Sequence, residues 1–463
     1  MRWRHGLLAV WICSALAGCG GEGRTERRAP DGGVTVPADD GGGGADASVP
    51  PDAATGDQGG PVGGGNDGGG GGGGNDGGGG GGNDGGGGGG GLVGPWPVVN
   101  LKFYGSAEGI GDDLIDASPD DGQNIWAASH NALYVLRPGQ TRFERFTATD
   151  GLHIGPFTDP EGRPNTTVIT ALAGGHAGEV FVGYYGYEST DPFHDTQAQK
   201  ELGNADRVVI GASSGGPLGI TRLLFPCDYG GGGGCWEDRS ARRMLYAHDG
   251  AAAGHLFIGF NHGVSHVFQG RIGDHIHPEI WYQPGNMLQL GEQLGLAVLP
   301  SGELWVAGRY AVGLQPWNPE PHFQWVDGHF IYAFTADSAD HELNVPVGYR
   351  ENNTGAAVTP DGVLWLSRMG GGLASWDPRT GSYSAIRKWP QVPSDLIDVQ
   401  ADPTGQLWVV TSGGQLWRFD PGTGALSQFG GVSGVRRIYV DTRVAPRALY
   451  AATSSGLAVI RVP

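Results

Sequence analysis

An aliphatic residue followed by an aromatic one recurs seven times between residues 125 and 450, and this repeat limits the possible folds more than any other feature. Each copy contains short apolar or alternating segments separated by Gly, Asp and Pro turns, and no long helical period appears. A four-stranded unit of about 40–45 residues is typical of a β-propeller blade. The sequence therefore predicts an all-β, seven-bladed propeller over residues 92–463. The aromatic members are Trp126, Phe181, Phe257, Trp305, Trp365, Trp408 and Tyr450.

The two clearest copies share the order strand, turn, aliphatic–aromatic pair, Gly turn, strand, and Asp-Pro-x-Thr-Gly. The last element is Asp377–Gly381 in one copy and Asp420–Gly424 in the next. Asp accepts hydrogen bonds from the turn backbone, Pro fixes φ, and Gly adopts a positive φ. We expect the aromatic residues of the second strands to pack between neighbouring blades as core.

These residues resemble the two-component regulator propeller repeat of periplasmic sensor regions in bacterial hybrid histidine kinases. The resemblance spans about residues 92–463 and is clearest in the fifth and sixth copies. It implies a propeller with a sensing or ligand-binding role. No transmembrane, kinase or DNA-binding segment follows the repeats, so we expect signalling to require another protein.

The last copy supplies only three strands, which end near Val462. An additional strand pattern, Val98–Tyr104, precedes the first copy. We expect this N-terminal segment to become the outer strand of the last blade. Such pairing would close the ring and join the two ends of the folded region.

The first 19 residues predict where in the cell the protein is located. Arg2 and Arg4 precede an apolar run, Leu7–Leu16, that is too short for a membrane-spanning helix and has the form of a secretory signal. The run ends in Leu-Ala-Gly-Cys19, which resembles the bacterial lipobox and implies that Cys19 is acylated after removal of residues 1–18. An ordinary signal peptide with an incidental Cys is the alternative. No second apolar stretch of about 18 residues follows, so we expect the lipid to be the membrane anchor of an envelope protein. Gly20, and not Asp, follows the Cys, and the resemblance to lipoproteins of enteric bacteria then implies sorting to the outer membrane.

Residues 19–91 predict a tether. The 72 positions from Gly20 onward hold 35 of the 90 glycines and almost no apolar side chains. Burial of apolar surface therefore cannot offset the conformational entropy that folding would cost, and we expect this segment to be disordered. Asn-Asp pairs recur at residues 66, 75 and 83 and resemble the calcium-binding nonapeptide repeat. The large apolar residue of that repeat is Gly here, which favours a solvated spacer over a calcium-binding roll.

Charge excludes one class of partner. The net charge is −19, and the chain has only three lysines, Lys102, Lys200 and Lys388. No basic stripe could follow a phosphate backbone, so we expect no nucleic-acid binding. No Walker loop or dinucleotide fingerprint occurs, and we expect a monomer without a cofactor.

The spacing between aligned aromatics locates three insertions, around His153–Asn165, Tyr187–Arg242 and His329–Asn353. The second insertion is expected to contain strands at Arg207–Gly211 and Ile220–Phe225. Our strand assignment places all three on one face, where long loops on a rigid scaffold commonly bind ligands. Aromatic, acidic and basic residues there would suit a sugar or peptide, although each could be a solvated loop residue. The candidates are Tyr184, Tyr185, Tyr187, His194, Asp195, Trp236, Asp337, His341 and Arg350.

Cysteine and histidine patterns offer two further hypotheses. Cys227 and Cys235 are separated by Asp-Tyr and five glycines, and we expect a disulfide in an oxidising compartment; a two-Cys metal site is the alternative. Histidines of the third copy are weak metal candidates, with structural or surface roles as the alternative. They are His262, His266, His275 and His277.

Three functional classes remain after these arguments. The preferred hypothesis is a binding or sensing module for a glycan, peptide or partner protein. The second is a propeller enzyme of the lyase or quinoprotein type, for which no catalytic residue can be assigned by motif. The third is a passive structural protein of the cell surface.

Overall fold

The computed structural model describes a chain made almost entirely of β-strands, which confirms the all-β prediction. Two short 3-10 helices, η1 (Ser106–Glu108) and η2 (Ala148–Asp150), are the exceptions among the described residues. No described helix is long and apolar enough to cross a membrane. The structure describes residues 100–462 except 159–161, 186–203, 224–239, 261–263, 277–278, 282–286, 290–292, 300–301, 309–311, 316, 319–323, 326–331, 335–352 and 378–386.

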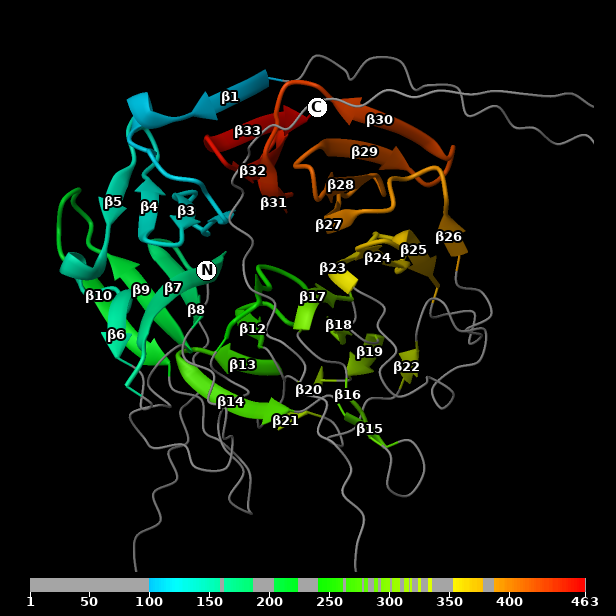
Figure 1. The fold of residues 1–463 in the computed structure, drawn as a ribbon, viewed down its shortest axis with the longest axis horizontal. Helices are drawn as coiled ribbons and strands as arrows, with labels where there is room; N and C mark the ends of the chain where they lie inside the picture. The colour runs from blue at the N-terminus through cyan, green and yellow to red at the C-terminus, as the bar shows by residue number, and fades with distance from the viewer. Residues whose placement is uncertain are drawn as a thin grey trace, which may run out of the picture. The chain divides into compact units, whose positions relative to one another are not determined.

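Seven sheets of four or five antiparallel strands are formed by the described residues, and they follow one another around a ring (Figure 1). The first contains β2 (Asp116–Pro119), β3 (Ile125–Ser129), β4 (Ala132–Leu136) and β5 (Glu144–Phe146). The second contains β6 (Gly155–Thr158), β7 (Pro164–Gly174), β8 (Glu179–Tyr185), β9 (Ala205–Ile210) and β10 (Leu218–Leu223). The third contains β11 (Arg243–Tyr246), β12 (His255–Gly259), β13 (Val264–Phe268) and β14 (Arg271–Ile276).

The remaining sheets repeat the same order. The fourth contains β17 (Gln293–Val298), β18 (Leu304–Gly308), β19 (Val312–Gln315) and β22 (Tyr332–Phe334). The fifth contains β23 (Asn353–Val358), β24 (Leu364–Arg368), β25 (Gly372–Trp376) and β26 (Arg387–Trp389), and the sixth contains β27 (Leu396–Ala401), β28 (Leu407–Thr411), β29 (Leu416–Asp420) and β30 (Ala425–Phe429). The last contains β31 (Val435–Asp441), β32 (Arg447–Thr453), β33 (Gly456–Val462) and β1 (Asn100–Tyr104). Two separate pairs are β15 (Glu279–Trp281) with β16 (Met287–Gln289), and β20 (Trp317–Asn318) with β21 (Gln324–Trp325).

The innermost strands close the ring. Each contacts the innermost strand of the next sheet, in the order β2, β7, β11, β17, β23, β27, β31 and back to β2. Residues of all seven strands line one central channel. This arrangement is a β-propeller, as the repeat predicted.

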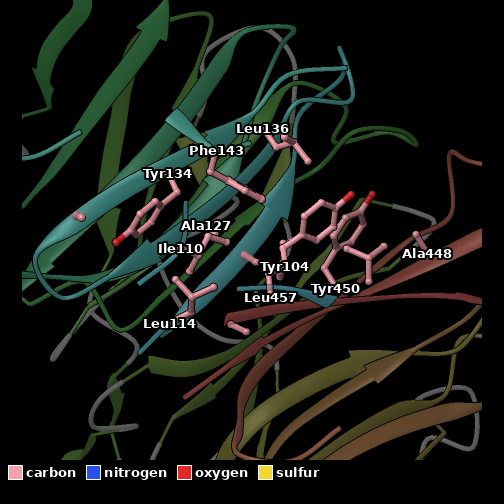
Figure 2. Close-up of a cluster of buried hydrophobic side chains, with 14 residues drawn as sticks. Tyr104, Ile110, Leu114, Ala127, Tyr134, Leu136, Phe143, Ala448, Tyr450 and Leu457 are labelled. Atoms are coloured by element: carbon pink, nitrogen blue, oxygen red, sulfur yellow. The ribbon is translucent and has the colours of Figure 1, made fainter. Parts of the chain in front are cut away.

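Pairing between β1 and β33 confirms the prediction for the N-terminal strand. The register runs from Asn100 opposite Arg461 to Tyr104 opposite Leu457. Tyr104 is buried in a cluster shared with the first sheet, where its ring meets that of Phe143 edge-on at 5.5 Å (Figure 2). The two ends of the described chain therefore belong to one sheet.

The seven recurring aromatic residues are all buried, with at most 4% of their surface exposed. Each lies in a different apolar cluster, and each cluster combines side chains from two neighbouring sheets. Their predicted role as core between sheets is confirmed.

The insertions add strands to the second sheet. Strand β6 lies in the first predicted insertion and pairs with the first residues of β7, which begins at the end of that insertion. Strands β9 and β10 begin two residues before the predicted Arg207–Gly211 and Ile220–Phe225. The third insertion lies almost wholly outside the described residues.

Candidate functional site

Two of the predicted ligand-binding residues lie in strand β8 and not in a loop. Tyr184 is fully buried among side chains of the first and second sheets, so it is a core residue and offers no surface to a ligand. Tyr185 follows it and is partly exposed, with the Arg242 guanidinium 5.8 Å from its ring centre. Tyr184 lies three residues after Phe181, as Ser129 lies three residues after Trp126 in β3, so it belongs to the second strand and not to the insertion that follows.

The buried Tyr184 hydroxyl belongs to a polar cluster on the face that carries the insertions. It donates to Asp206 Oδ2 at 2.7 Å, and His153 Nδ1 approaches the same oxygen at 2.6 Å. Arg222 Nη1 lies 3.4 Å from Asp206 Oδ1. Burial, followed by the charge of Asp206 and its hydrogen bond, raises the pKa of Tyr184 well above its usual value. Asp206 is fully buried, whereas the His153 side chain is 47% exposed.

The remaining site predictions have different outcomes. His266 is fully buried in β13, which places it in the core, and His275 lies in β14. Among the described residues, no group of three or more His, Cys, Asp or Glu side chains is arranged so that it could hold a metal ion. The other predicted site residues lie outside the described ranges: Cys19, Tyr187, His194, Asp195, Cys227, Cys235, Trp236, His262, His277, Asp337, His341 and Arg350.

Charged side chains cross the central channel near the starts of the innermost strands. Arg437 Nη1 pairs with Asp116 Oδ2 at 2.9 Å, and Arg243 Nη2 pairs with Asp398 Oδ1 at 3.0 Å. These four residues occupy equivalent places in their sheets, each opposite the second residue after the recurring aromatic. The equivalent residues in the other sheets are small, and they are Ala171, Gly295 and Gly355.

The same carboxylates also connect neighbouring innermost strands. Asp116 Oδ2 accepts from the Leu172 amide at 3.0 Å, and Asp398 Oδ2 accepts from the Ile438 amide at 3.0 Å. A Cβ added to Gly355 would lie 3.1 Å from Asp398 Oδ1 and 2.9 Å from the Ser367 hydroxyl. The small residues therefore leave the space that these ion pairs use.

The opposite end of the channel opens into a hollow of about 540 Å³. It lies where innermost strands turn into second strands, so it is on the face opposite the predicted insertions. The turn after β11 and the turn after β31 form most of its wall, with a contribution from the end of β17. Its lining residues are Leu245, Tyr246, Ala247, His248, Asp249, Gly250, Val298, Leu299, Tyr439, Asp441, Thr442 and Arg443.

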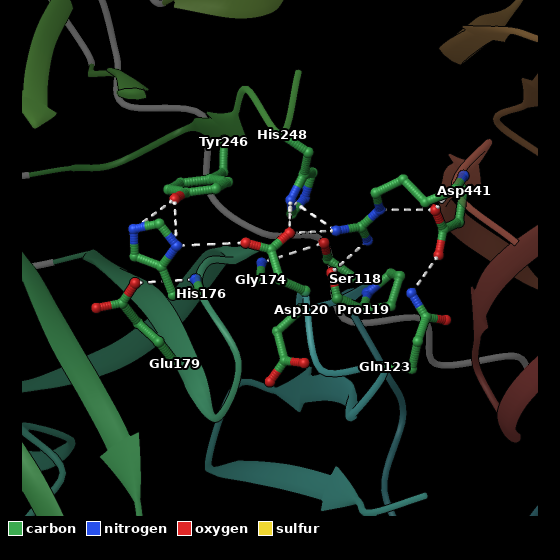
Figure 3. Close-up of polar contacts among 12 residues, drawn as sticks. Ser118, Pro119, Asp120, Gln123, Gly174, His176, Glu179, Tyr246, His248 and Asp441 are labelled. Carbon is green, nitrogen blue, oxygen red and sulfur yellow. Dashed lines mark hydrogen bonds and ion pairs between the residues drawn. The ribbon is translucent and has the colours of Figure 1, made fainter. Parts of the chain in front are cut away.

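A polar network, the mouth cluster, borders this hollow and is centred on Asp121. Figure 3 labels three of its members, His176, Tyr246 and His248. Asp121 Oδ1 lies 2.7 Å from His248 Nδ1 and 2.9 Å from Arg443 Nη1, and its Oδ2 lies 3.3 Å from His176 Nδ1. The Tyr246 hydroxyl approaches the His176 ring nitrogens at 3.2 and 3.3 Å. Asp121, His176, His248 and Arg443 lie in the turns after four innermost strands, and Tyr246 ends β11, so the cluster holds those turns together.

Electrostatics favour the neutral form of His248. Burial raises the pKa of Asp121, but hydrogen bonds and charges from His248, His176 and Arg443 outweigh it and lower that pKa. Burial and the charge of Arg443 lower the pKa of His248, which favours neutral imidazole. His248 Nδ1 faces both an acceptor, Asp121 Oδ1 at 2.7 Å, and a donor, Arg443 Nη1 at 2.6 Å. Its Nε2 is buried and has no hydrogen-bond partner among the described residues.

Sequence reasoning missed the mouth cluster. It treated this face as one of short turns, and Asp121, His176, His248 and Arg443 lie far apart in the chain. A usable signal was that these residues occupy the turns between the first and second strands, the place that Asp402–Gly405 takes between β27 and β28 in one of the clearest copies.

Comparisons with known proteins agree on the fold alone. No family model matches the chain, and no curated protein matches it. Similar solved structures include virginiamycin B lyase from Staphylococcus aureus, with 12% identity, a TM-score of 0.48, and coverage of 79% of this chain and 100% of that one. YCF48 bound to D1 peptide has 14% identity, a TM-score of 0.46, and coverage of 80% and 96%. The WD40 β-propeller domain of Doa1 has 11% identity, a TM-score of 0.46, and coverage of 78% and 97%.

Proposed function

We propose that this protein is a cell-envelope lipoprotein whose β-propeller acts as a binding or sensing module for a glycan, peptide or partner protein. The observation that carries the proposal is the hollow at the channel mouth. Its volume of about 540 Å³ is within the range of ligand sites, roughly 300–1,000 Å³. Polar and aromatic side chains line it, and the turns that present them are fixed by paired strands.

Ligand arrays test the binding function directly. The probe is the mature chain with Cys19→Ser, which removes the proposed lipid and keeps the protein in solution. Thr442 is an exposed residue in the lining of the hollow, so Thr442→Trp places a large side chain there. Asp361→Trp places the same side chain on an exposed turn of the fifth sheet and is the control. Binding to an array ligand that is lost in the first variant and kept in the second would support the proposal. An array without any bound ligand, or loss in both variants, would contradict it.

Lipid anchoring at Cys19 and sorting to the outer membrane are part of the proposal. The basic start, the short apolar run and Leu-Ala-Gly-Cys support them. Radiolabelled palmitate should enter the wild-type protein and not the Cys19→Ser variant. Equal labelling of the two would contradict the anchor.

We also propose that the ring has seven blades of the two-component regulator propeller type. Seven sheets of four or five strands among the described residues support this number, as does their closed order of contacts. A ring of six would leave one of these sheets outside the propeller. An experimental structure would decide between the two by the rotation that relates successive sheets.

One observation favours an enzyme as the second candidate. His248 Nδ1 lies 2.7 Å from Asp121 Oδ1 and 2.6 Å from Arg443 Nη1, and an imidazole held in this way can exchange a proton with a ligand through its buried Nε2. The test is a comparison of ligand turnover with ligand binding. Binding without any chemical change of the ligand would leave the binding module as the function.

A further inference from the structure

Two largely buried arginines stand at the end of the central channel that lies away from the hollow. Arg243 and Arg437 belong to β11 and β31, the innermost strands of the third and last sheets, and both line the channel. The side chain of Arg243 is 8% exposed and that of Arg437 is 21% exposed. Two guanidinium groups therefore share the wall of one interior space.

Most of the donors of these arginines have no partner in the protein. Each guanidinium carries five N–H groups. Among the described residues, the Arg243 guanidinium donates to Asp398 Oδ1 at 3.0 Å and to no other group. The Arg437 guanidinium donates to Asp116 Oδ2 at 2.9 Å and to the Arg242 carbonyl at 3.3 Å. The remaining nitrogens keep contact with solvent, so they are open to a guest in the channel.

The two carboxylates beside the arginines have already used most of their acceptor sites. Asp116 accepts from two backbone amides and from Arg437. Asp398 likewise accepts from two backbone amides and from Arg243. A carboxylate has about four acceptor sites, so the N–H groups without a partner outnumber the acceptors that remain on these two residues.

The charge of the channel lining is also positive. Arg243 and Arg437 share the lining with one carboxylate, that of Asp116, because Asp398 does not line the channel. His248 lies toward the hollow and is favoured as neutral imidazole because burial lowers its pKa. An excess of donors and an excess of positive charge both favour an anionic guest.

The channel has room for a small organic group. Its volume is about 160 Å³, and a cavity of about 150 Å³ accommodates benzene. Leucine, valine and alanine side chains make up much of its wall, and they suit an aliphatic stem. The channel adjoins the hollow, with which it shares the lining residues Leu245, Tyr246, His248, Val298 and Tyr439. A ligand in the hollow can therefore extend a short stem toward the arginines.

We propose that the channel binds a carboxylate group on a short aliphatic stem, which enters from the hollow. Arg243 and Arg437 donate to the carboxylate oxygens, and the stem lies against the apolar wall. A carboxylate accepts without donating, and its two oxygens match the planar fork of a guanidinium. This inference rests on the proposed binding function and specifies the group that the ligand of the hollow carries.

Calorimetric titration of the mature Cys19→Ser chain tests the ligand class. Butyrate and butyramide have nearly the same shape and differ in charge, and we expect butyrate to bind at least tenfold more tightly. Sulfate should bind more weakly than butyrate, because it lacks the aliphatic stem. Nα-acetyl-glycyl-alanine and its C-terminal amide form a second pair. Tighter binding of this peptide acid than of butyrate identifies a chain end as the source of the carboxylate, and the reverse order identifies a free acid.

Matched variants locate the site. Arg243→Lys and Arg437→Lys keep the positive charge but lose the planar fork, so each should weaken butyrate binding at least tenfold. Arg436→Lys is the control, because Arg436 is exposed and does not line the channel, and it should leave binding unchanged. Unfolding midpoints show whether each variant is folded.

A measurement without any substitution in the channel covers the case in which a lysine variant does not fold. Crystals grown with 3-bromopropionate should show the anomalous signal of bromine inside the channel, between the two arginines and the hollow. The bromine marks the end of the stem, so its position also gives the direction in which the carboxylate points.

Several results would overturn the inference. These are equal binding of butyramide, tighter binding of sulfate, full butyrate binding by both lysine variants, bromine on the outer surface alone, or no binding of any carboxylate. If no carboxylate binds but an array ligand is still lost on Thr442→Trp, the ligand class is wrong and the binding function stands. If the array also yields nothing, the binding function itself fails.

Discussion

Trp126 donates its indole N–H to Asp120 Oδ2 at 3.0 Å, and Asp120 lies six residues earlier, in the turn between β2 and β3. Trp408 and Asp402 repeat the relationship in the sixth sheet at 3.4 Å, and Trp365 donates to the Thr359 hydroxyl in the fifth at 3.1 Å. The aromatic of the second strand therefore does more than fill space, because it also fixes the turn that precedes it.

Replacing Asp120 should be strongly destabilising. Its buried carboxylate also accepts from the Asn124 amide at 3.0 Å and from the Gly178 amide of the next sheet at 2.9 Å. Asp120→Ala leaves several buried donors unsatisfied, and each costs about 1–3 kcal/mol. We expect a loss of more than about 2 kcal/mol in the free energy of unfolding, measured in urea. Asp361→Ala, at an exposed turn position, is the control and should change it by less than about 0.5 kcal/mol.

Removing β1 should destabilise the whole ring. A chain beginning at residue 105 lacks the β1–β33 ladder and the buried Tyr104 ring, whereas a chain beginning at residue 95 keeps both. We expect the shorter chain to unfold at least about 5 °C lower by calorimetry. Equal midpoints for the two chains would show that β1 is dispensable.

The channel should not tolerate a side chain at Gly355. Gly355→Ala places a Cβ 2.9 Å from the Ser367 hydroxyl and 3.1 Å from Asp398 Oδ1, so the Arg243–Asp398 pair must shift. Overpacking of this kind costs about 1–3 kcal/mol. Gly211→Ala is the matched control, because a Cβ there meets nothing within 4 Å. A normal urea midpoint for Gly355→Ala would mean that the channel wall yields easily.

Acid should weaken the fold through His255. Burial, and then the charge of His266, lower the pKa of His255 to about 4 from an ordinary value of 6.5. Below pH 6.5 the unfolded chain takes up a proton that the folded chain refuses, so stability falls as the pH drops toward about 4. The full difference corresponds to about 3 kcal/mol.

A variant isolates this contribution from that of the carboxylates. His255 stacks on Phe268 with ring centres 4.0 Å apart, so His255→Phe keeps an aromatic ring in place. The free energy of unfolding should decline less steeply between pH 6.5 and 4 in the variant. Parallel curves for the two proteins would remove His255 as the cause.

The sequence predicted the features that repeat. The aromatic positions were predictable because a buried ring recurs at the same place in each sheet, and Trp126 and Trp408 show the same turn contact. The N-terminal strand was predictable because the last copy lacked a partner for the edge residues of β33. The repeat, the charge and the number of expected strands can all be read directly from the amino-acid sequence.

The mouth cluster depended on features that do not repeat. His248 and Arg443 meet only because the ring brings the third sheet close to the last across the channel, and their separation of 195 residues hides the contact. Such side chains become partners through closure of the ring and not through local sequence.

The position of β1 also determines how the fold would meet mechanical load. The chain that precedes Asn100 enters the propeller at this outer strand, and the same strand completes the sheet of β31, β32 and β33. Tension applied through the N-terminal segment would therefore act first on the β1–β33 hydrogen bonds. Their rupture would free the edge of β33, so the strand that closes the ring is also where pulling would begin to open it.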